Sequence, residues 1–158
     1  MSSSFRAVVE SGVASGHRGA MRQASTILSI DTPGRGFTEI TRAMAEWLAQ
    51  TGIEEGLLTL LCRHTSASLL IQENAAREVR VDIAAWLDRL APEGAHYAHD
   101  DEGPDDMPAH LKATLTGVNL QIPVIDGRMA LGTWQGIYLA EHRRRPHCRE
   151  IAVHLMGE

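Results

Sequence analysis

Three separated groups of polar residues carry the side chains best suited to chemistry in this chain of 158 residues. The first is His64-Thr65-Ser66-Ala67-Ser68, which follows a strongly apolar run. At strand ends of this kind, side chains and free backbone N–H groups converge on anions. A single histidine at such a place can equally be a satisfied structural residue, so both interpretations stay open.

The second group is Asp106 and His110, which stand four residues apart. On a helix this spacing places two side chains on one face, so the carboxylate and the imidazole would lie within reach of a shared proton or metal ion. The alternative is a helix-capping aspartate and an unrelated surface histidine. The preceding residues 96–104 are rich in histidine and acid, and we expect a loop that faces solvent or a ligand.

The third group is Trp134 and Gln135, which follow an Asp126-Gly127 turn in a segment whose alternation predicts a strand. A buried glutamine loses roughly 1–3 kcal/mol for each unmet hydrogen bond, so the pair favours a polar pocket with a flat apolar wall. The other interpretation has Trp134 in the core and Gln135 in solvent. Glu141 shares the strand face of Gln135, but six residues of strand span about 20 Å, too far for one small ligand.

Known motifs narrow this chemistry only slightly. The histidines and acids nearest the first two groups are His64, His96, His99, Asp106 and His110. Their spacing matches neither HExxH nor a zinc finger, so a metal ion is permitted but not demanded. The chain contains no GxGxxG, P-loop or GxSxG motif. Ser66 or Ser68 would align poorly with His64 as nucleophile and base, because neighbouring strand residues alternate faces.

Composition argues against several classes of function. A formal net charge of −5 disfavours general nucleic-acid binding, which requires a basic face. The one basic cluster is Arg143, Arg144, Arg145 and Arg149. It lies beside Pro146, and we interpret it as a solvated turn that keeps a sheet edge soluble.

The apolar runs and the cysteines indicate the compartment. Runs such as residues 57–62 are far shorter than the ~20 residues of a membrane-spanning helix, so no membrane partner is expected. Cys62 and Cys148 form no CxxC pair, and we expect reduced thiols in a cytoplasmic protein. Residues 1–20 lack the apolar segment of a secretory signal and are expected to be a flexible N-terminal extension.

Hydrophobic periodicity predicts the elements that position these residues. Strands are predicted at residues 26–30, 57–62, 68–72, 120–125, 128–132, 134–141 and 150–155. One helix is predicted from the helical spacing of Phe37, Ile40, Met44, Trp47 and Leu48, with Gly52 ending it.

Two further helices are predicted. The apolar residues of the second are Val79, Ile83, Trp86, Leu87 and Leu90. Asn74 is its expected N-cap. A short third helix begins at Asp105 or Asp106, with Pro108 in its first turn and Leu111 and Leu115 on its buried side. Residues 21–158 are therefore predicted to form a single compact α+β domain, with a mixed or antiparallel sheet, two main helices and a short third one.

Together, three ordered motifs resemble the YjbQ family, whose members are often labelled secondary thiamine-phosphate synthases. The motifs are residues 64–68, 105–112 and 126–137, and the likeness covers roughly residues 21–155. His110 matches the family pattern directly. Either Asp105 or Asp106 takes the acidic role of the family, and the four-residue spacing to His110 favours Asp106.

The resemblance implies a homotrimer, and pockets between its subunits would collect residues from two chains. It also implies weak joining of a pyrimidine diphosphate to a thiazole phosphate with release of pyrophosphate. Such chemistry needs positive charge on the leaving pyrophosphate, usually through a divalent metal ion, and a shielded pocket.

The resemblance also suggests roles for individual residues. Catalytic roles would fall to His64, Asp106, His110 and Gln135. Contacts to a phosphorylated small molecule would fall to Arg63, Thr65, Ser66, Lys112, Arg128 and Trp134. A divalent metal ion, Mg²⁺ or Zn²⁺, would be held by His64, Asp106, His110 and Glu141. The alternatives are a non-catalytic trimer that binds a metal or an anionic metabolite, and a metal-dependent phosphoester hydrolase.

Overall fold

The strands form two antiparallel sheets in a computed structural model that describes residues 20–94 and 96–158. The larger sheet has the order β1-β8-β3-β5-β6. Its strands are β1 (Arg22–Thr32), β3 (Gly56–Cys62), β5 (Asn119–Ile125), β6 (Arg128–Met129) and β8 (His147–Gly157). The smaller sheet has the order β2-β7-β4, with β2 (Gly36–Glu39), β4 (Ala67–Glu73) and β7 (Gln135–Glu141). The sequence predicted a mixed or an antiparallel sheet. Every strand pair among the described residues is antiparallel, so the antiparallel alternative is the correct one.

Alternation along the strands separates a core face from an outer face. Leu58 and Leu60 of β3 point inward together with Val153 and Leu155 of β8, and all four are buried. Ile27 and Leu61 point outward on the same sheet and are about half exposed. The hydrophobic core therefore lies on one side of the larger sheet.

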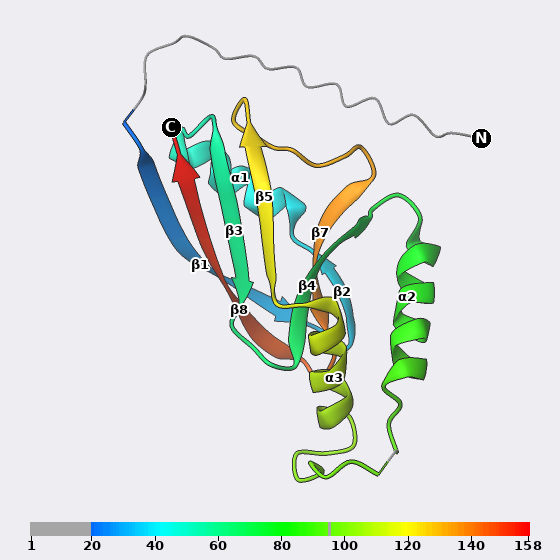
Figure 1. Ribbon diagram of the computed structural model, residues 1–158. Coiled ribbons are helices and arrows are strands. Elements are labelled where there is room, and N and C mark those ends of the chain that lie inside the picture. Colours follow the sequence, from blue (N-terminus) through cyan, green and yellow to red (C-terminus); the bar gives the residue numbers. More distant parts are fainter. Residues whose placement is uncertain (1–19, 95) are drawn as a thin grey trace, which may run out of the picture.

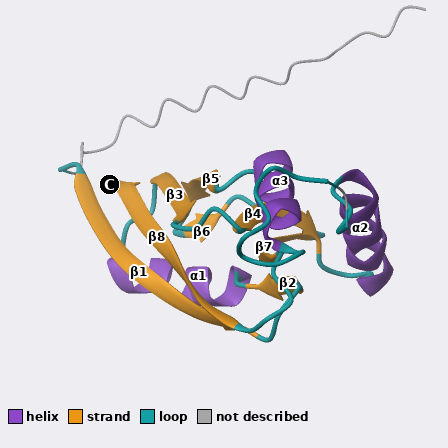
Figure 2. Cartoon of the chain, turned by 90° about the horizontal axis from the view of Figure 1, so that it is seen from below, coloured by secondary structure: helices purple, strands orange, loops and turns teal. Residues whose placement is uncertain are grey.

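Three helices accompany the sheets: α1 (Thr41–Thr51), α2 (Arg77–Leu90) and α3 (Asp106–Thr116). Figure 1 shows α1 crossing behind β3 and β5, and Met44 and Leu48 of this helix belong to the core. Figure 2 shows α2 and α3 gathered at the end of the molecule that holds the smaller sheet. The α+β architecture with three helices is therefore confirmed. Among the described residues, no helix is long and apolar enough to cross a membrane.

Several helix details differ from the sequence prediction. Phe37 belongs to the short strand β2, which periodicity missed because four residues are too few for a pattern. The N-cap position of α2 is Ala76 and not Asn74, and it makes no side-chain capping bond. Trp86 and Leu115 were expected in the core, but they are 48% and 56% exposed.

The segment before β7 is a turn and not the half-buried strand predicted there. The backbone N–H of Gln135 donates to the Gly132 carbonyl at 2.9 Å, and the Gln135 side-chain oxygen accepts from the Gly132 N–H at 2.8 Å. Trp134 is 65% exposed, so neither a polar pocket nor core packing describes this pair. The Gln135 amide thus satisfies the Gly132 N–H through a local side chain to backbone bond just before the strand begins.

A buried ion pair joins the two sheets. Glu141 at the end of β7 and Arg149 on β8 are 1% and 5% exposed, and two hydrogen bonds of 2.6 Å connect them. Glu141 also accepts from Thr32 Oγ1 at 2.9 Å and from the Arg143 N–H at 2.9 Å. Burial raises the pKa of Glu141, but the Arg149 guanidinium and the Arg143 amide outweigh it and hold the pKa below its usual value.

We predict that breaking this ion pair is costly. Glu141→Gln leaves the Arg149 guanidinium buried without a counter-charge, so the free energy of unfolding should fall by about 3–5 kcal/mol in equilibrium urea unfolding. The matched control is Glu150→Gln in the exposed Arg63–Glu150 pair, which should cost less than about 1 kcal/mol. A Glu141→Gln protein as stable as the control would contradict the role given to the pair.

A second buried polar network holds β4 against α3. Ser68 Oγ lies 2.8 Å from His142 Nε2 and 2.6 Å from Thr116 Oγ1, and Thr116 Oγ1 lies 2.9 Å from the Lys112 carbonyl oxygen. Because the carbonyl can only accept, the hydrogen bonds run from the neutral His142 ring through Ser68 and Thr116 to Lys112. Burial and, to a smaller extent, the Lys112 ammonium lower the pKa of His142 to about 4.

We predict that His142 makes the fold sensitive to acid. The histidine has its ordinary pKa of 6.5 in the unfolded chain and a pKa of about 4 in the folded chain. Between these two pH values the unfolded state binds more protons than the folded state. The free energy of unfolding should therefore decrease as the pH is lowered, by up to about 1.4 kcal/mol per pH unit. His142→Gln should flatten this slope in urea titrations from pH 7 to 4.5, and His154→Gln on the outer sheet face should not. Equal slopes for wild type and His142→Gln would refute the assignment.

Candidate metal centre

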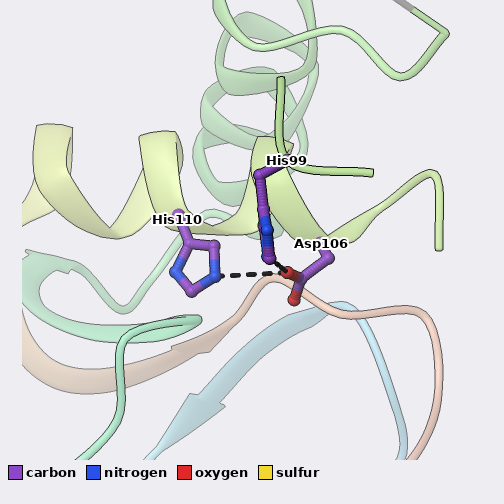
Figure 3. A group of neighbouring side chains, drawn as sticks. All are labelled: His99, Asp106 and His110. Carbon is purple, nitrogen blue, oxygen red and sulfur yellow. Dashed lines mark hydrogen bonds and ion pairs between the residues drawn. The ribbon is translucent and has the colours of Figure 1, made fainter. Parts of the chain in front are cut away.

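Two histidines and one aspartate meet beside the first turn of α3. His99 Nε2 lies 2.8 Å and His110 Nε2 lies 3.2 Å from the same oxygen, Oδ2 of Asp106. Figure 3 shows both rings turned toward this carboxylate, His110 from the helix and His99 from the preceding loop. Asp106 is 2% exposed, whereas both imidazoles reach solvent.

The backbone fixes the tautomer of His110. Its Nδ1 lies 3.0 Å from the Thr65 carbonyl oxygen, which can only accept, so Nδ1 carries the proton. In the neutral ring, Nε2 then holds a lone pair that faces the Asp106 carboxylate. Two acceptors at 3.2 Å repel each other unless a proton or a cation lies between them.

The spacing of the three donor atoms suits a metal ion. One atom from each of His99, Asp106 and His110 lies within 4.8 Å of the others. In a tetrahedral zinc site with bonds of about 2.0–2.1 Å, ligand atoms stand roughly 3.3 Å apart. Two imidazoles and one carboxylate also match the donor preference of zinc and related transition metals better than that of Mg²⁺, which prefers oxygen. The residues present therefore fit a divalent metal ion.

Arg143 orients the acidic member of the cluster. Its Nη1 pairs with Asp106 Oδ1, which leaves Oδ2 for the two histidines. Its Nε donates to Asp105 Oδ2 at 3.3 Å, and the Arg144 N–H donates to the same oxygen at 2.8 Å. Burial raises the pKa of Asp105, but these donors outweigh it and keep the pKa below its usual value. Asp105 thus holds the bend at Arg143 and Arg144 in place, and Asp106 is the residue that faces the two histidines.

An open cavity of about 660 Å³ adjoins the cluster on the side of His110. Its polar lining includes Arg63, His64, Thr65, His110, Thr114 and Asn119. A volume of this size accommodates a small organic substrate. His110 therefore contacts both the candidate metal position and a space for a ligand.

His64 lines this cavity but does not join the cluster. Its Nε2 accepts a hydrogen bond from the Glu150 backbone N–H at 2.8 Å, so Nδ1 carries the proton of the neutral ring. Burial lowers the pKa of His64, and the nearby Arg149 charge lowers it further. His64 is thus a neutral hydrogen-bond donor at the cavity and not a metal ligand through Nε2.

Other residues assigned from the sequence have structural partners. Lys112 is 2% exposed and pairs with Asp88 of α2, so it does not reach a phosphate in the cavity. Ser66 accepts a hydrogen bond from Arg149 at 3.2 Å. Glu141 has both oxygens occupied in the ion pair with Arg149 and lies outside the cluster.

The remaining assigned residues lie elsewhere. Gln135 pairs with Glu73 at one end of the smaller sheet, and Glu141 pairs with Ala67, next to the His64 turn, at the other. Because seven strand residues span about 20 Å, one chain does not bring Trp134 and Gln135 to the cluster. Arg128 is an exposed residue of the short strand β6, in the larger sheet.

Sequence reasoning missed His99 and Arg143 as members of this centre. The loop was expected to face solvent or a ligand because of its histidines and acids, and that was the available signal for His99. Arg143 was interpreted as part of a solvated turn. Its role depends on contacts with Asp105 and Asp106, which lie 38 and 37 positions earlier in the chain, and no local pattern reveals such contacts.

Comparisons with known proteins agree with the fold and the motifs. A family model described as "UPF0047 protein YjbQ-like" matches residues 26–158. A UPF0047 protein of Synechocystis is 47% identical over 138 residues, which cover 87% of this chain and 94% of that protein. The YjbQ protein of Salmonella typhimurium is 45% identical over 132 residues, which cover 83% of this chain and 96% of its own length.

A solved structure shares the architecture. The crystal structure of a hypothetical protein from Aeropyrum pernix superposes with a TM-score of 0.79 at 29% identity, covering 85% of this chain and 99% of that one. The match of the family model over nearly all described residues and the identity of the two bacterial relatives lead to one conclusion. This chain belongs to the YjbQ-like UPF0047 family.

Proposed function

We propose that this protein is a metal-dependent enzyme that acts on a phosphorylated small molecule. The supporting observation is the convergence of His99 Nε2, His110 Nε2 and Asp106 Oδ2, with the His110 ring oriented by the Thr65 carbonyl. A cluster of two imidazoles and one buried carboxylate beside a ligand-sized cavity is typical of a catalytic metal site.

The protein's own groups would orient and polarise the reactants. Thr65 fixes the ring of His110, and Arg143 holds Asp106 so that one oxygen faces the metal position. With three protein ligands, a tetrahedral site keeps one position for water or substrate. A divalent cation at this position would stabilise negative charge on a leaving phosphate group.

The cavity supplies donors for phosphate oxygens. Arg63 stands at its rim, and its pairing with Glu150 at 2.6 Å is exposed and readily exchanged for a substrate anion. Thr65 offers a hydroxyl, and His64 offers its Nδ1 proton without adding charge. These three residues replace Lys112 and Arg128 in our assignment of substrate contacts.

The specific reaction we propose is the one that the sequence motifs suggest, namely the joining of a pyrimidine diphosphate to a thiazole phosphate with release of pyrophosphate. Its central requirement is the departure of a pyrophosphate group, which a cation held by His99, Asp106 and His110 would assist. Hydrolysis of a phosphoester would also need a cation that stabilises the leaving phosphate group. Metal binding without turnover would need only the three ligands. Activity assays separate these three outcomes.

We predict that the cluster binds one zinc ion per chain and that activity depends on it. Zinc affinity, measured by competition with a chromogenic chelator, should fall at least about 10-fold in His99→Ala and in His110→Ala, because each removes one ligand. His154→Ala, on the outer face of the larger sheet, is the matched control and should bind zinc like the wild type.

Activity is measured on the metal-loaded wild type with the two thiamine precursors and, separately, with a phosphomonoester. Chelation and His110→Ala should each abolish the product that is formed. Tight zinc binding with no product from either assay would favour the non-catalytic alternative. Zinc affinity equal in His110→Ala and in the wild type would overturn the metal centre itself.

We also propose that the functional form is a homotrimer. The outer face of the larger sheet exposes Ile27, Leu61 and Met156 at 49%, 45% and 47%, and a shallow cavity of about 520 Å³ lies among β1, β3 and β8. An apolar sheet face of this kind is typical of a contact between subunits. A neighbouring chain could then supply Trp134 and Gln135 to a shared site.

We predict a trimer mass in light scattering coupled to size-exclusion chromatography. Leu61→Glu should reduce the mass to that of a monomer, because it places a charge in the proposed contact. Val81→Glu, at an exposed apolar residue of α2, is the control and should leave the trimer intact. A wild-type monomer at all concentrations would refute the proposal.

A further inference from the structure

Three consecutive arginines line a second cavity. It has a volume of about 390 Å³, and its basic lining consists of Arg143, Arg144, Arg145 and His147. Gly103, Pro104 and Asp105, which immediately precede Asp106 in the chain, also line it, and Asp105 is bound to Arg143 and Arg144. This basic cavity and the candidate metal centre thus share the same stretch of loop.

Backbone hydrogen bonds hold the bend formed by residues 143–145 in place. The Arg143 N–H donates to Glu141 at 2.9 Å, and the Arg144 N–H donates to Asp105 at 2.8 Å. At Gly34, which has a φ of +124°, a Cβ atom would approach the Arg144 carbonyl oxygen to 2.4 Å, so only glycine permits this contact. The basic side chains therefore extend from a preorganised backbone and not from a loose turn.

The charges around this cavity are compensated unequally. Arg143 is paired with Asp105 and Asp106, and Arg144 is paired with Glu93. In the described part of the chain, no carboxylate oxygen lies within 4.0 Å of Arg145. His147 donates Nδ1–H to the Arg145 carbonyl at 2.8 Å, which leaves its Nε2 available.

We propose that this basic cavity is a binding site for the phosphate group of a small molecule. Guanidinium groups bind phosphate oxygens in a bidentate manner, and Arg145 has this capacity unused. Glu102 on the rim opposes an anion, but it is an exposed residue and is screened by solvent. The volume leaves room for the organic group that carries the phosphate.

Arg143 couples this site to the metal centre, and this part of the inference rests on the proposed function. The guanidinium lines the basic cavity while it binds Asp106, whose other oxygen faces His99 and His110. A cation on Asp106 draws carboxylate charge away from Arg143, which leaves the guanidinium a stronger partner for an anion. Cation and phosphate should therefore strengthen each other's binding by the same factor.

The test is isothermal titration of the full chain with inorganic phosphate, in zinc-free protein and in protein loaded with zinc and freed of excess ion. Arg145→Gln should weaken phosphate binding at least about 10-fold in both forms and leave zinc affinity unchanged. Zinc should tighten phosphate binding at least about 5-fold in the wild type. Arg128→Gln, an exposed arginine of the β5–β6 hairpin, is the control and should behave like the wild type.

Equal phosphate affinity of Arg145→Gln and wild type would overturn the phosphate site, whatever the result with zinc. Phosphate binding that depends on Arg145 but not on zinc would overturn the coupling through Arg143. A wild type that binds no zinc would refute the proposed metal centre, and the zinc-free titration would still decide the phosphate site. The failures of the two proposals are thus distinguishable.

Discussion

The buried pair of Glu141 and Arg149 is the constraint on which the functional end of this molecule depends. A carboxylate and a guanidinium excluded from water are tolerated only when each finds a complete set of partners. Glu141 meets this demand by collecting the hydroxyl of Thr32, the guanidinium of Arg149 and the backbone N–H of Arg143. These partners come from β1, from β8 and from the bend that connects β7 to β8. One carboxylate therefore fixes the place where the two sheets meet.

The position of Asp106 follows from this junction. Because the Arg143 backbone is bound to Glu141, its side chain extends toward α3 and binds Asp105 and Asp106. The carboxylate of Asp106 is then held with one oxygen occupied and one facing His99 and His110. A structural ion pair in the core and a chemically available cluster at the surface are thus connected by a single arginine. The histidines also form a structural group and a chemically available group. His64 and His142 hydrogen-bond to structural protein groups through Nε2, whereas His99 and His110 direct Nε2 toward the Asp106 carboxylate.

The sequence predicts those parts of the fold and site that depend on short-range order. Alternation located most strands, and the four-residue spacing of Asp106 and His110 placed them on one helical face, where the structure has them. His99 could not be assigned in this way because it belongs to a loop, whose path depends on tertiary contacts. Lys112 was assigned to phosphate because the family resemblance suggested this role, and its burial depends on an ion pair with Asp88, 24 residues earlier on α2. Gln135 misled the prediction because its side chain closes a turn that alternation treats as strand.

The open cavity and the exposed sheet face are not independent features. Leu61 belongs to β3, and Arg63 follows the last residue of this strand with its N–H still donating to the Glu150 carbonyl of β8 at 3.0 Å, so strand alternation directs both side chains toward the same side of the larger sheet. Arg63 lies at the rim of the cavity that contains His64 and His110, and Leu61 belongs to the apolar outer face. A neighbouring chain that covers Leu61 must therefore pass close to the cavity mouth. Assembly would exclude water from the cavity and strengthen every charge interaction inside it, which an isolated chain with an open cavity does not achieve.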